Sequence, residues 1–183
     1  PLEDPTAVMF DPDRVVEVEI TLDPGDWDEL RMQARSVVDI LGPGCLEEPT
    51  VNPFTWFPST VTIDGETVAD VGVRKKGFLG SLSETRPSLK LKFSEYTKKG
   101  RFHGLERMTL NNNRQDASRL SSCLAYTVFA AAGLPAPRCN FAHVTVNGVD
   151  LGLYSHVDSI KKRFVRDRFD GDDEGELYEG ALS

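Results

Sequence analysis

Two short segments place basic residues at alternate positions, and together they could bind a phosphate-bearing ligand. Arg74 and Lys76 have this spacing in VGVRKKG, and Lys90 and Lys92 have it in PSLKLKF. Alternate residues of a strand point to one face, so neighbouring strands would gather four cations on one face of a sheet. Lysine and arginine are common partners of phosphate oxygens. A solvated surface face is the alternative interpretation.

The segment between these two predicted strands, KGFLGSLSETRPS, contains Gly77, Gly80 and Ser81. A loop rich in glycine and hydroxyl groups can bring backbone N–H groups close to a phosphate. Neither GxxxxGK nor GxGxxG is present, so the loop alone does not identify a nucleotide site.

A polar segment, LNNNRQDASRL, separates a predicted strand from a long apolar helix. Asp116 is the predicted N-cap of that helix, which would run from about Ala117 to Ala132, because its carboxylate can accept from the free N–H groups of the first turn. Asn112 and Arg114 would order the turn beside the basic strand and support the site without reacting. A simple turn, in which the asparagines satisfy local backbone groups, is the alternative.

The elements that must position these residues follow from hydrophobic periodicity and turn signals. Strands are predicted at 14–22, 59–64, 67–74, 87–93, 107–112 and 175–180, and a second hairpin turns at Asn147-Gly148; helices are predicted from Asp23, from Ala117 and at 159–169. Antiparallel hairpins with segregated helices predict an α+β fold. We expect a single domain over 1–183 in which 36–58 is an ordered loop insertion carrying aromatic anchors.

Composition limits the possible partners. The 183 residues carry a formal charge of −8 with a pI of about 4.9, which argues against nucleic acid as a bulk electrostatic partner. No run of 18 apolar residues is present, so we predict no membrane span, and we expect a monomer.

The chain has three cysteines and no sequence pattern typical of a metal site. Cys45 and Cys139 both lie in loops rich in proline and glycine, and we predict that they form a disulfide, with two unpaired thiols as the alternative. Cys123 falls among apolar helix residues and is interpreted as a buried thiol. A disulfide would imply an extracytoplasmic location.

Six segments in order are similar to the CotH family, the spore-coat-protein-H kinase-like proteins, and to its secreted or surface branch. They are VGVRKKGFLGS, RPSLKLKF, LNNNRQDAS, AAGLPAPRC, VNGVDLGLY and GELYEG. The resemblance extends from about Val8 to Gly180. It implies an atypical protein-kinase-like fold, binding of ATP with a divalent metal such as Mg²⁺, and phosphorylation of a protein substrate.

The resemblance also implies roles for particular residues. GFLGS would be the loop over the phosphates, and Lys90 or Lys92 would hold the α- and β-phosphates. Asp158 would lie at the adenine-binding linker, where relatives usually carry glutamate. The helix from Ala117 would be the counterpart of the kinase regulatory helix.

The family's acidic metal motif is expected downstream of GELYEG, and the sequence ends at Ser183 without it. Phosphoryl transfer needs the metal and a positioned base, so no catalytic residue is assigned. We expect the N-terminal portion of a longer CotH-like domain, inactive alone. The alternative is a non-catalytic extracellular binding or adhesion module that uses the same fold and binds a surface protein through its basic face.

Overall fold

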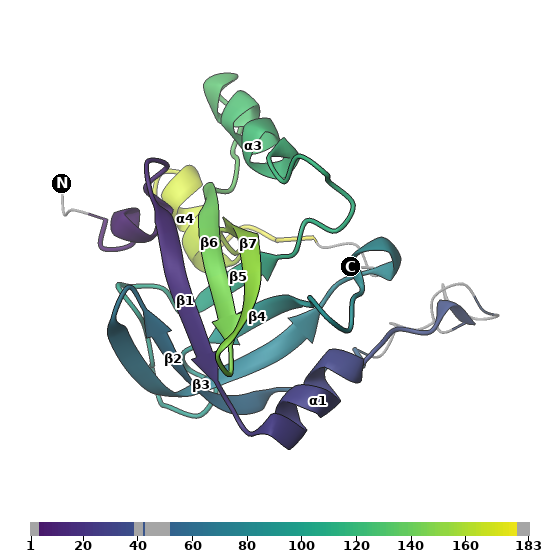
Figure 1. Cartoon of the computed structure of the whole chain (residues 1–183). Helices are drawn as coiled ribbons and strands as arrows, with labels where there is room; N and C mark the ends of the chain where they lie inside the picture. The colour runs from purple at the N-terminus through teal and green to yellow at the C-terminus, as the bar shows by residue number, and fades with distance from the viewer. Residues whose placement is uncertain (1–3, 39–41, 43–51, 179–183) are drawn as a thin grey trace.

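The computed structural model describes residues 4–38, 42 and 52–178, and in these ranges seven strands close into a barrel (Figure 1). Around the barrel the order is β1–β2–β3–β4–β5–β7–β6. The bounds are β1 Val15–Thr21, β2 Phe57–Ile63, β3 Glu66–Lys76, β4 Ser88–Lys92, β5 Arg107–Asn111, β6 Cys139–Val146 and β7 Val149–Val157.

Neighbouring strands are antiparallel except for β1 and β6, whose parallel pairing closes the barrel. The predicted α+β class with a mostly antiparallel sheet is confirmed. Closure was not predicted, because it joins Val15 to Phe141 across most of the chain, and no local pattern reports such a contact.

Local turn chemistry forms the two predicted hairpins. Asp64 and Gly65 have φ of 48° and 87°, and Asn147 and Gly148 have φ of 49° and 79°. A two-residue hairpin loop of this kind needs positive φ at both positions, which asparagine, aspartate and glycine tolerate best.

Alternate strand residues fill the barrel interior. In β1, Val16, Val18 and Ile20 are buried while the residues between them are exposed. The same alternation in β6 buries every second residue from Asn140. Outward-facing positions of the strands are therefore the ones available to a ligand.

Helix α1, Pro24–Met32, begins as predicted, with the Asp23 carboxylate accepting from Gly25 N at 2.7 Å and Asp26 N at 3.3 Å. Helix α4, Lys162–Arg168, follows β7. Short 3-10 turns span Ala7–Phe10 and Leu79–Ser81.

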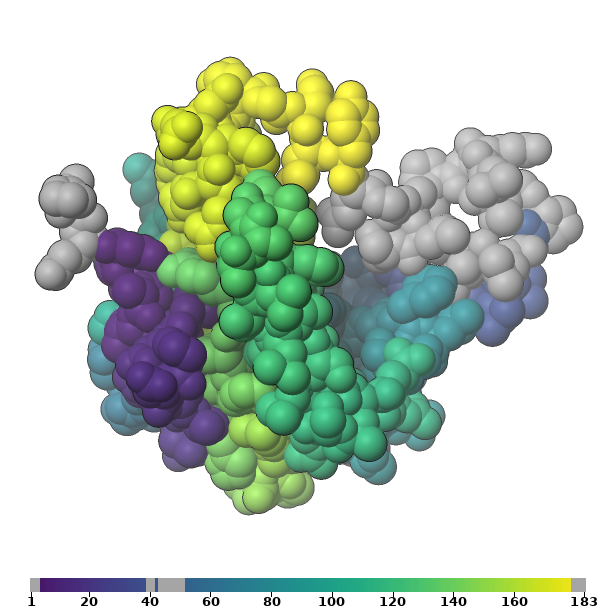
Figure 2. Space-filling model, turned by 90° about the horizontal axis from the view of Figure 1, so that it is seen from above, coloured from purple at the N-terminus to yellow at the C-terminus, as the bar shows by residue number. Residues whose placement is uncertain are grey.

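Helix α3, Ser121–Ala131, projects from the barrel (Figure 1) and buries Cys123 alone among its residues. In the view from above, no described part of the chain lies over α3 (Figure 2). Its predicted start at Ala117 is wrong, and so is the predicted N-cap Asp116, because Leu120 occupies the N-cap position. The Asp116 carboxylate binds Ser118 N at 3.0 Å, forming a turn that delays the helix until Ser121.

Two other predictions concern segments that the structure describes only in part. The predicted strand at 175–180 is wrong over its described residues, because 175–178 form no strand. Of the predicted loop insertion, residues 39–41 and 43–51, including Cys45, lie outside the described residues. Phe54 and Phe57 at its end are buried. In the described ranges no helix is both long and apolar enough to cross a bilayer.

Candidate functional site

The pairing of β3 with β4 brings the four predicted cations onto one face. Arg74 pairs with Lys90 across the two strands, and Gly72 pairs with Lys92. These cations are half-buried and alternate with fully buried inward residues. They therefore lie on the outer face of the barrel, Lys76 nearest the β3–β4 loop and Lys92 farthest from it.

The Lys76 ammonium is buried and held by a hydrogen bond. Its Nζ donates to Asn111 Oδ1 at 2.5 Å. Burial, followed by the positive charge of Lys90, lowers the pKa of Lys76 to about 8. Burial and a neighbouring like charge both disfavour the protonated lysine, so an anion between Lys76 and Lys90 would be bound favourably.

Arg74 and Lys92 form a separate group around Trp56. The Arg74 guanidinium lies 4.6 Å from the Trp56 ring centroid, and Lys92 Nζ lies 6.0 Å from it. Lys92 also forms an ion pair with Glu95 at 2.7 Å. The structure therefore gives Lys92 a carboxylate partner and divides the predicted set of four cations into two pairs.

The predicted phosphate loop is ordered by its own contacts. Gly77 has φ of 136°, a conformation that glycine adopts readily. Ser81 Oγ accepts from Phe78 N at 2.9 Å and donates to Phe78 O at 3.0 Å. A Cβ atom at Gly80 would lie 1.9 Å from the Gln115 side-chain nitrogen, so this glycine lets the loop pack against the segment that leads to α3.

The predicted supporting residues connect this loop to α3. Asn112 Nδ2 donates to Ser81 O at 2.9 Å, and Arg114 donates to Leu82 O. Asp116 accepts from Ser121 N at 2.8 Å, at the first residue of the helix. The Ser118 hydroxyl and then the Ser121 N–H lower the pKa of Asp116 to about 2, so this carboxylate is ionised at neutral pH.

Asp158 is not brought together with the loop. Its buried carboxylate accepts from Arg138 Nη2 at 3.0 Å and from Arg163 Nη2 at 3.1 Å. Arg138 precedes β6 and Arg163 lies in α4, so this cluster fixes the segment that leaves the barrel after β7. Both oxygens of Asp158 are engaged by arginine.

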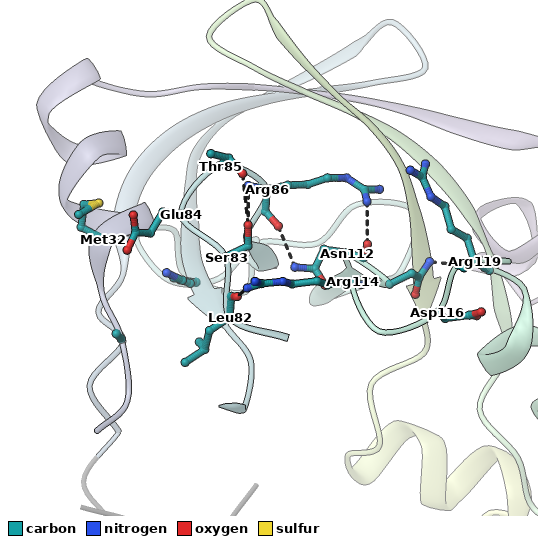
Figure 3. A pocket seen from close by; sticks show the side chains of 14 residues that line it. Met32, Leu82, Ser83, Glu84, Thr85, Arg86, Asn112, Arg114, Asp116 and Arg119 are labelled. Carbon is teal, nitrogen blue, oxygen red and sulfur yellow. Dashed lines mark hydrogen bonds between the residues drawn. The ribbon is translucent and has the colours of Figure 1, made fainter. Parts of the chain in front are cut away.

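A cavity of about 680 Å³ opens at the end of the barrel where β3 and β5 finish (Figure 3). The segments that line it are the end of α1, the loop at 82–86 and the segment 112–119. It contains Asn112, Arg114 and Asp116, together with three cations to which the sequence analysis assigned no role: Lys75, Arg86 and Arg119.

The missed cations differ in whether a sequence pattern indicated where their side chains lie. Lys75 lies between Arg74 and Lys76, so strand alternation already places it on the inner face with Val73; its exposure is 2%. Arg86 had no such signal. Its Nε donates to Leu151 O at 2.7 Å, a carbonyl that lies 65 residues away.

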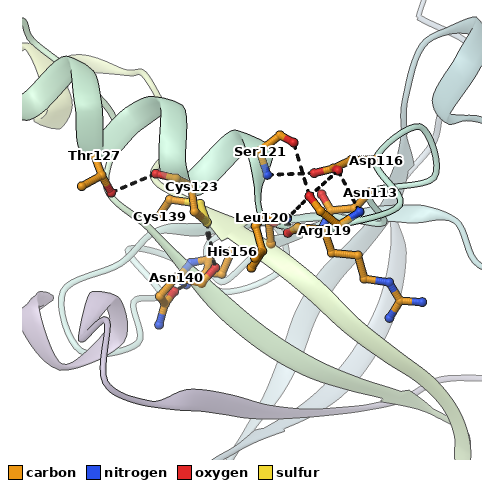
Figure 4. The surroundings of a disulfide bond; sticks show 12 residues. Asn113, Asp116, Arg119, Leu120, Ser121, Cys123, Thr127, Cys139, Asn140 and His156 are labelled. Carbon is orange, nitrogen blue, oxygen red and sulfur yellow. Dashed lines mark hydrogen bonds between the residues drawn. A yellow bond between two sulfur atoms is a disulfide. The ribbon is translucent and has the colours of Figure 1, made fainter.

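The predicted disulfide between Cys45 and Cys139 is wrong, because Cys139 is bonded to Cys123 (Figure 4). Cys139, the first residue of β6, faces outward toward the first turn of α3, and the two Cα atoms lie 5.1 Å apart. Cys123 is therefore not a free buried thiol. The sulfur pair fastens α3 to the outer side of β6.

Within residues 4–38, 42 and 52–178, no group of three His, Cys, Asp or Glu side chains could hold a metal ion. Of the acidic residues considered above, Asp116 accepts from the N–H groups of Ser118 and Ser121, and Asp158 pairs with Arg138 and Arg163.

A comparison with known protein families gives a match over much of the chain. The family described as CotH kinase protein matches residues 73–182, from the middle of β3 through both basic strands, the disulfide and α4. No curated protein matches the chain. Because the family match covers more than half of the 183 residues, the chain belongs to the CotH kinase protein family.

Proposed function

We propose that this chain is the nucleotide-binding portion of a CotH-type atypical protein kinase, which binds ATP on the outer face of β3 and β4 and phosphorylates a protein in the full-length molecule. The observation that carries the proposal is the pair Lys76 and Lys90, two neighbouring cations on adjacent strands. Phosphate oxygens between them would offset the burial and repulsion that lower the pKa of Lys76.

The surroundings of the pair suit a polyphosphate. The loop with Gly77, Gly80 and Ser81 begins directly after Lys76 and leads into β4. A glycine-containing loop and a lysine on a strand are parts with which kinases hold the phosphates of ATP.

The basic residues of this face and Asp158 would have different roles toward bound ATP. Lys76 and Lys90 would contact phosphate oxygens, while Arg74, stacked on Trp56, and Lys92, paired with Glu95, would extend the positive face. Asp158 would position the linker after β7 through Arg138 and Arg163 instead of contacting adenine. Bound Mg²⁺ would neutralise the phosphates.

Calorimetric titration with ATP, with and without Mg²⁺, tests the proposal. We expect saturable binding that weakens at least tenfold in Lys76→Met and in Lys90→Met. Lys98→Met is the matched control, because Lys98 is an exposed lysine in the turn after β4, and it should bind ATP as the parent chain does.

Binding of equal strength in all three variants would place ATP elsewhere and contradict the proposed site. Failure of both the chain and the full-length protein to bind ATP would overturn the nucleotide function. The basic face would then be better explained by a non-catalytic extracellular binding or adhesion module.

The proposed setting is extracytoplasmic, secreted or on the cell surface, because structural disulfides such as Cys123–Cys139 form and persist in oxidising compartments. The proposed partner is a protein substrate or a surface protein. Fractionation of the native host, with the disulfide state read by mass spectrometry, tests this setting. Recovery of the protein in the cytoplasm with reduced Cys123 would contradict it.

A further inference from the structure

The cavity at the end of the barrel carries a cluster of positive charge that the proposed nucleotide face does not use. Lys75 points to the inner side of β3, whereas Lys76 and Lys90 point to the outer side. Arg86, Arg114 and Arg119 lie on the segments around the cavity. The two cation sets are therefore separated by the sheet and its loop.

The cavity cations are held by neutral carbonyl groups. Lys75 Nζ donates to Arg31 O at 2.5 Å, and Arg114 donates to Leu82 O. Arg86 donates to Leu151 O at 2.7 Å, to Asn112 O at 2.8 Å and to Leu153 O. These bonds orient the side chains, but a neutral carbonyl group does not neutralise their positive charge.

Ion pairs in the described ranges lie elsewhere, so no carboxylate pairs with any of the four cavity cations. Two carboxylates do line the cavity. Asp116 is occupied by the N–H groups of Ser118 and Ser121. Glu84 acts on Lys75 only through its charge, at longer range. The cavity is therefore lined by more cations than carboxylates, four against two, although the whole chain has a net charge of −8.

The two arginines at the centre also repel one another. The pKa of Arg86 is lowered first by burial and also by the charge of Arg119, while the charges of Tyr154 and Asp150 raise it in part. In Figure 3 the guanidinium groups of Arg86 and Arg119 extend toward the same part of the cavity. Such an arrangement is stabilised when an anion lies between the two groups.

We propose that this cavity is a second anion site, which binds a compact phosphate-bearing small molecule between Arg86, Arg114 and Arg119. Guanidinium groups match phosphate oxygens with two parallel hydrogen bonds. The hydroxyls of Ser83 and Thr85 also line the cavity and can donate to the same ligand. A volume of about 680 Å³ accommodates more than one phosphate group and falls in the range of small-molecule sites.

Tripolyphosphate, titrated by calorimetry without Mg²⁺, is the probe. The titration is made in a Lys90→Met background, so that the outer face contributes as little as possible. We expect saturable binding that weakens at least tenfold in Arg114→Gln/Arg119→Gln. Both arginines are exposed, so their replacement should leave the fold intact.

Arg101→Gln is the matched control, because Arg101 is also exposed and donates to a single carbonyl, Gly104 O at 3.3 Å. It should bind the probe unchanged. The side-chain amide resonance of Asn113, which lines the cavity, should shift on binding in the parent and control chains but not in the double variant.

Three results would overturn the second site. They are no binding of tripolyphosphate in the Lys90→Met background, equal binding with and without the two arginines, and tighter binding of citrate than of tripolyphosphate, which would make the ligand a carboxylate. Because the background lacks Lys90, each result is independent of whether ATP binds the outer face.

Discussion

Cys123, in the first turn of α3, is disulfide-bonded to Cys139, the first residue of β6. Only Cys123 is buried in α3, and apolar side chains such as Leu124, Val128 and Phe129 are exposed. The helix therefore has little packing of its own against the barrel, and the sulfur bridge is its principal attachment in the described structure. The position of α3 on the barrel therefore depends on this bridge.

Removing the bridge should release α3 more than it weakens the barrel. We expect Cys123→Ser/Cys139→Ser to lower the free energy of unfolding by about 3 kcal/mol, the value for a closed loop of about 15 residues in the chain-entropy model. Hydrogen exchange should accelerate in α3 before it does in β1 or β6.

Cys45→Ser is the control for this prediction. With Cys139 bonded to Cys123, we expect Cys45 to be the one thiol that alkylates without reduction, and its replacement should leave stability and exchange unchanged. A stability loss in Cys45→Ser equal to that of the double variant would mean that Cys45 contributes to a bridge.

The parts of the fold that were predictable from the sequence are those fixed by neighbouring residues. Asp64-Gly65 and Asn147-Gly148 specify their turns through φ alone, and Asp23 caps α1 through N–H groups two and three residues away. Strand alternation placed Arg74 and Lys90 on one face. Each of these is a local physical constraint.

The errors come from long-range contacts. The disulfide partner of Cys139 depends on where α3 crosses β6, which loop composition cannot indicate. The cavity depends on carbonyls of β7 meeting Arg86 from 65 and 67 residues away. The role of Asp158 at an adenine-binding linker stays a prediction from the resemblance, and its arginine partners come from two different elements.

Arg86 should be more important for stability than an exposed arginine of the same cavity. Its guanidinium satisfies three carbonyls and stacks 4.7 Å from the Tyr154 ring centroid. Lysine cannot reproduce that fork, and half-buried carbonyls left unpaired are costly. We expect Arg86→Lys to lower the free energy of unfolding by about 3 kcal/mol in urea denaturation.

Arg114→Lys provides the comparison, because Arg114 is exposed and donates to Leu82 O alone. Its effect should stay within about 0.5 kcal/mol. If the two lysine variants were equally stable, the three carbonyl bonds of Arg86 would have no net effect on stability.

His143 joins three strands and should make a small contribution to stability that depends on pH. Its Nδ1 lies 2.8 Å from a Glu17 oxygen and its Nε2 lies 2.9 Å from an Asp150 oxygen. The hydrogen bond to Glu17, with the charges of both carboxylates, raises the pKa of His143. Its stabilisation is therefore complete below the unfolded pKa of about 6.5 and is lost as pH rises through the raised folded value.

The measurement is the melting temperature of the chain and of His143→Gln between pH 6 and 9. Because the site is partly exposed, we expect the two proteins to differ in free energy of unfolding by less than about 1 kcal/mol. The difference in melting temperature should disappear at the alkaline end of the range. A difference that grows with pH would have the wrong sign for a protonated His143 between two carboxylates.

His156 should have the opposite dependence on pH. It is fully buried, stacked on Phe10 at 4.5 Å between ring centroids, and its Nδ1 contacts Asn140 Oδ1 at 3.0 Å and Met9 O at 3.2 Å. Its Nε2 has no hydrogen-bond partner in the described structure. Burial lowers the pKa of His156 to about 4, so the ring is neutral at physiological pH.

Because the unfolded chain binds a proton near pH 6.5 and the folded chain does not until about pH 4, stability should fall progressively as pH decreases between these values. The linkage amounts to about 3 kcal/mol at most. NMR titration of the His156 ring protons gives the direct measurement: they should stay constant from pH 8 to 5.5. A His156 midpoint above pH 6 would show that water or a counter-charge reaches Nε2, and the acid-sensitive part of the stability curve would then have to come from another group.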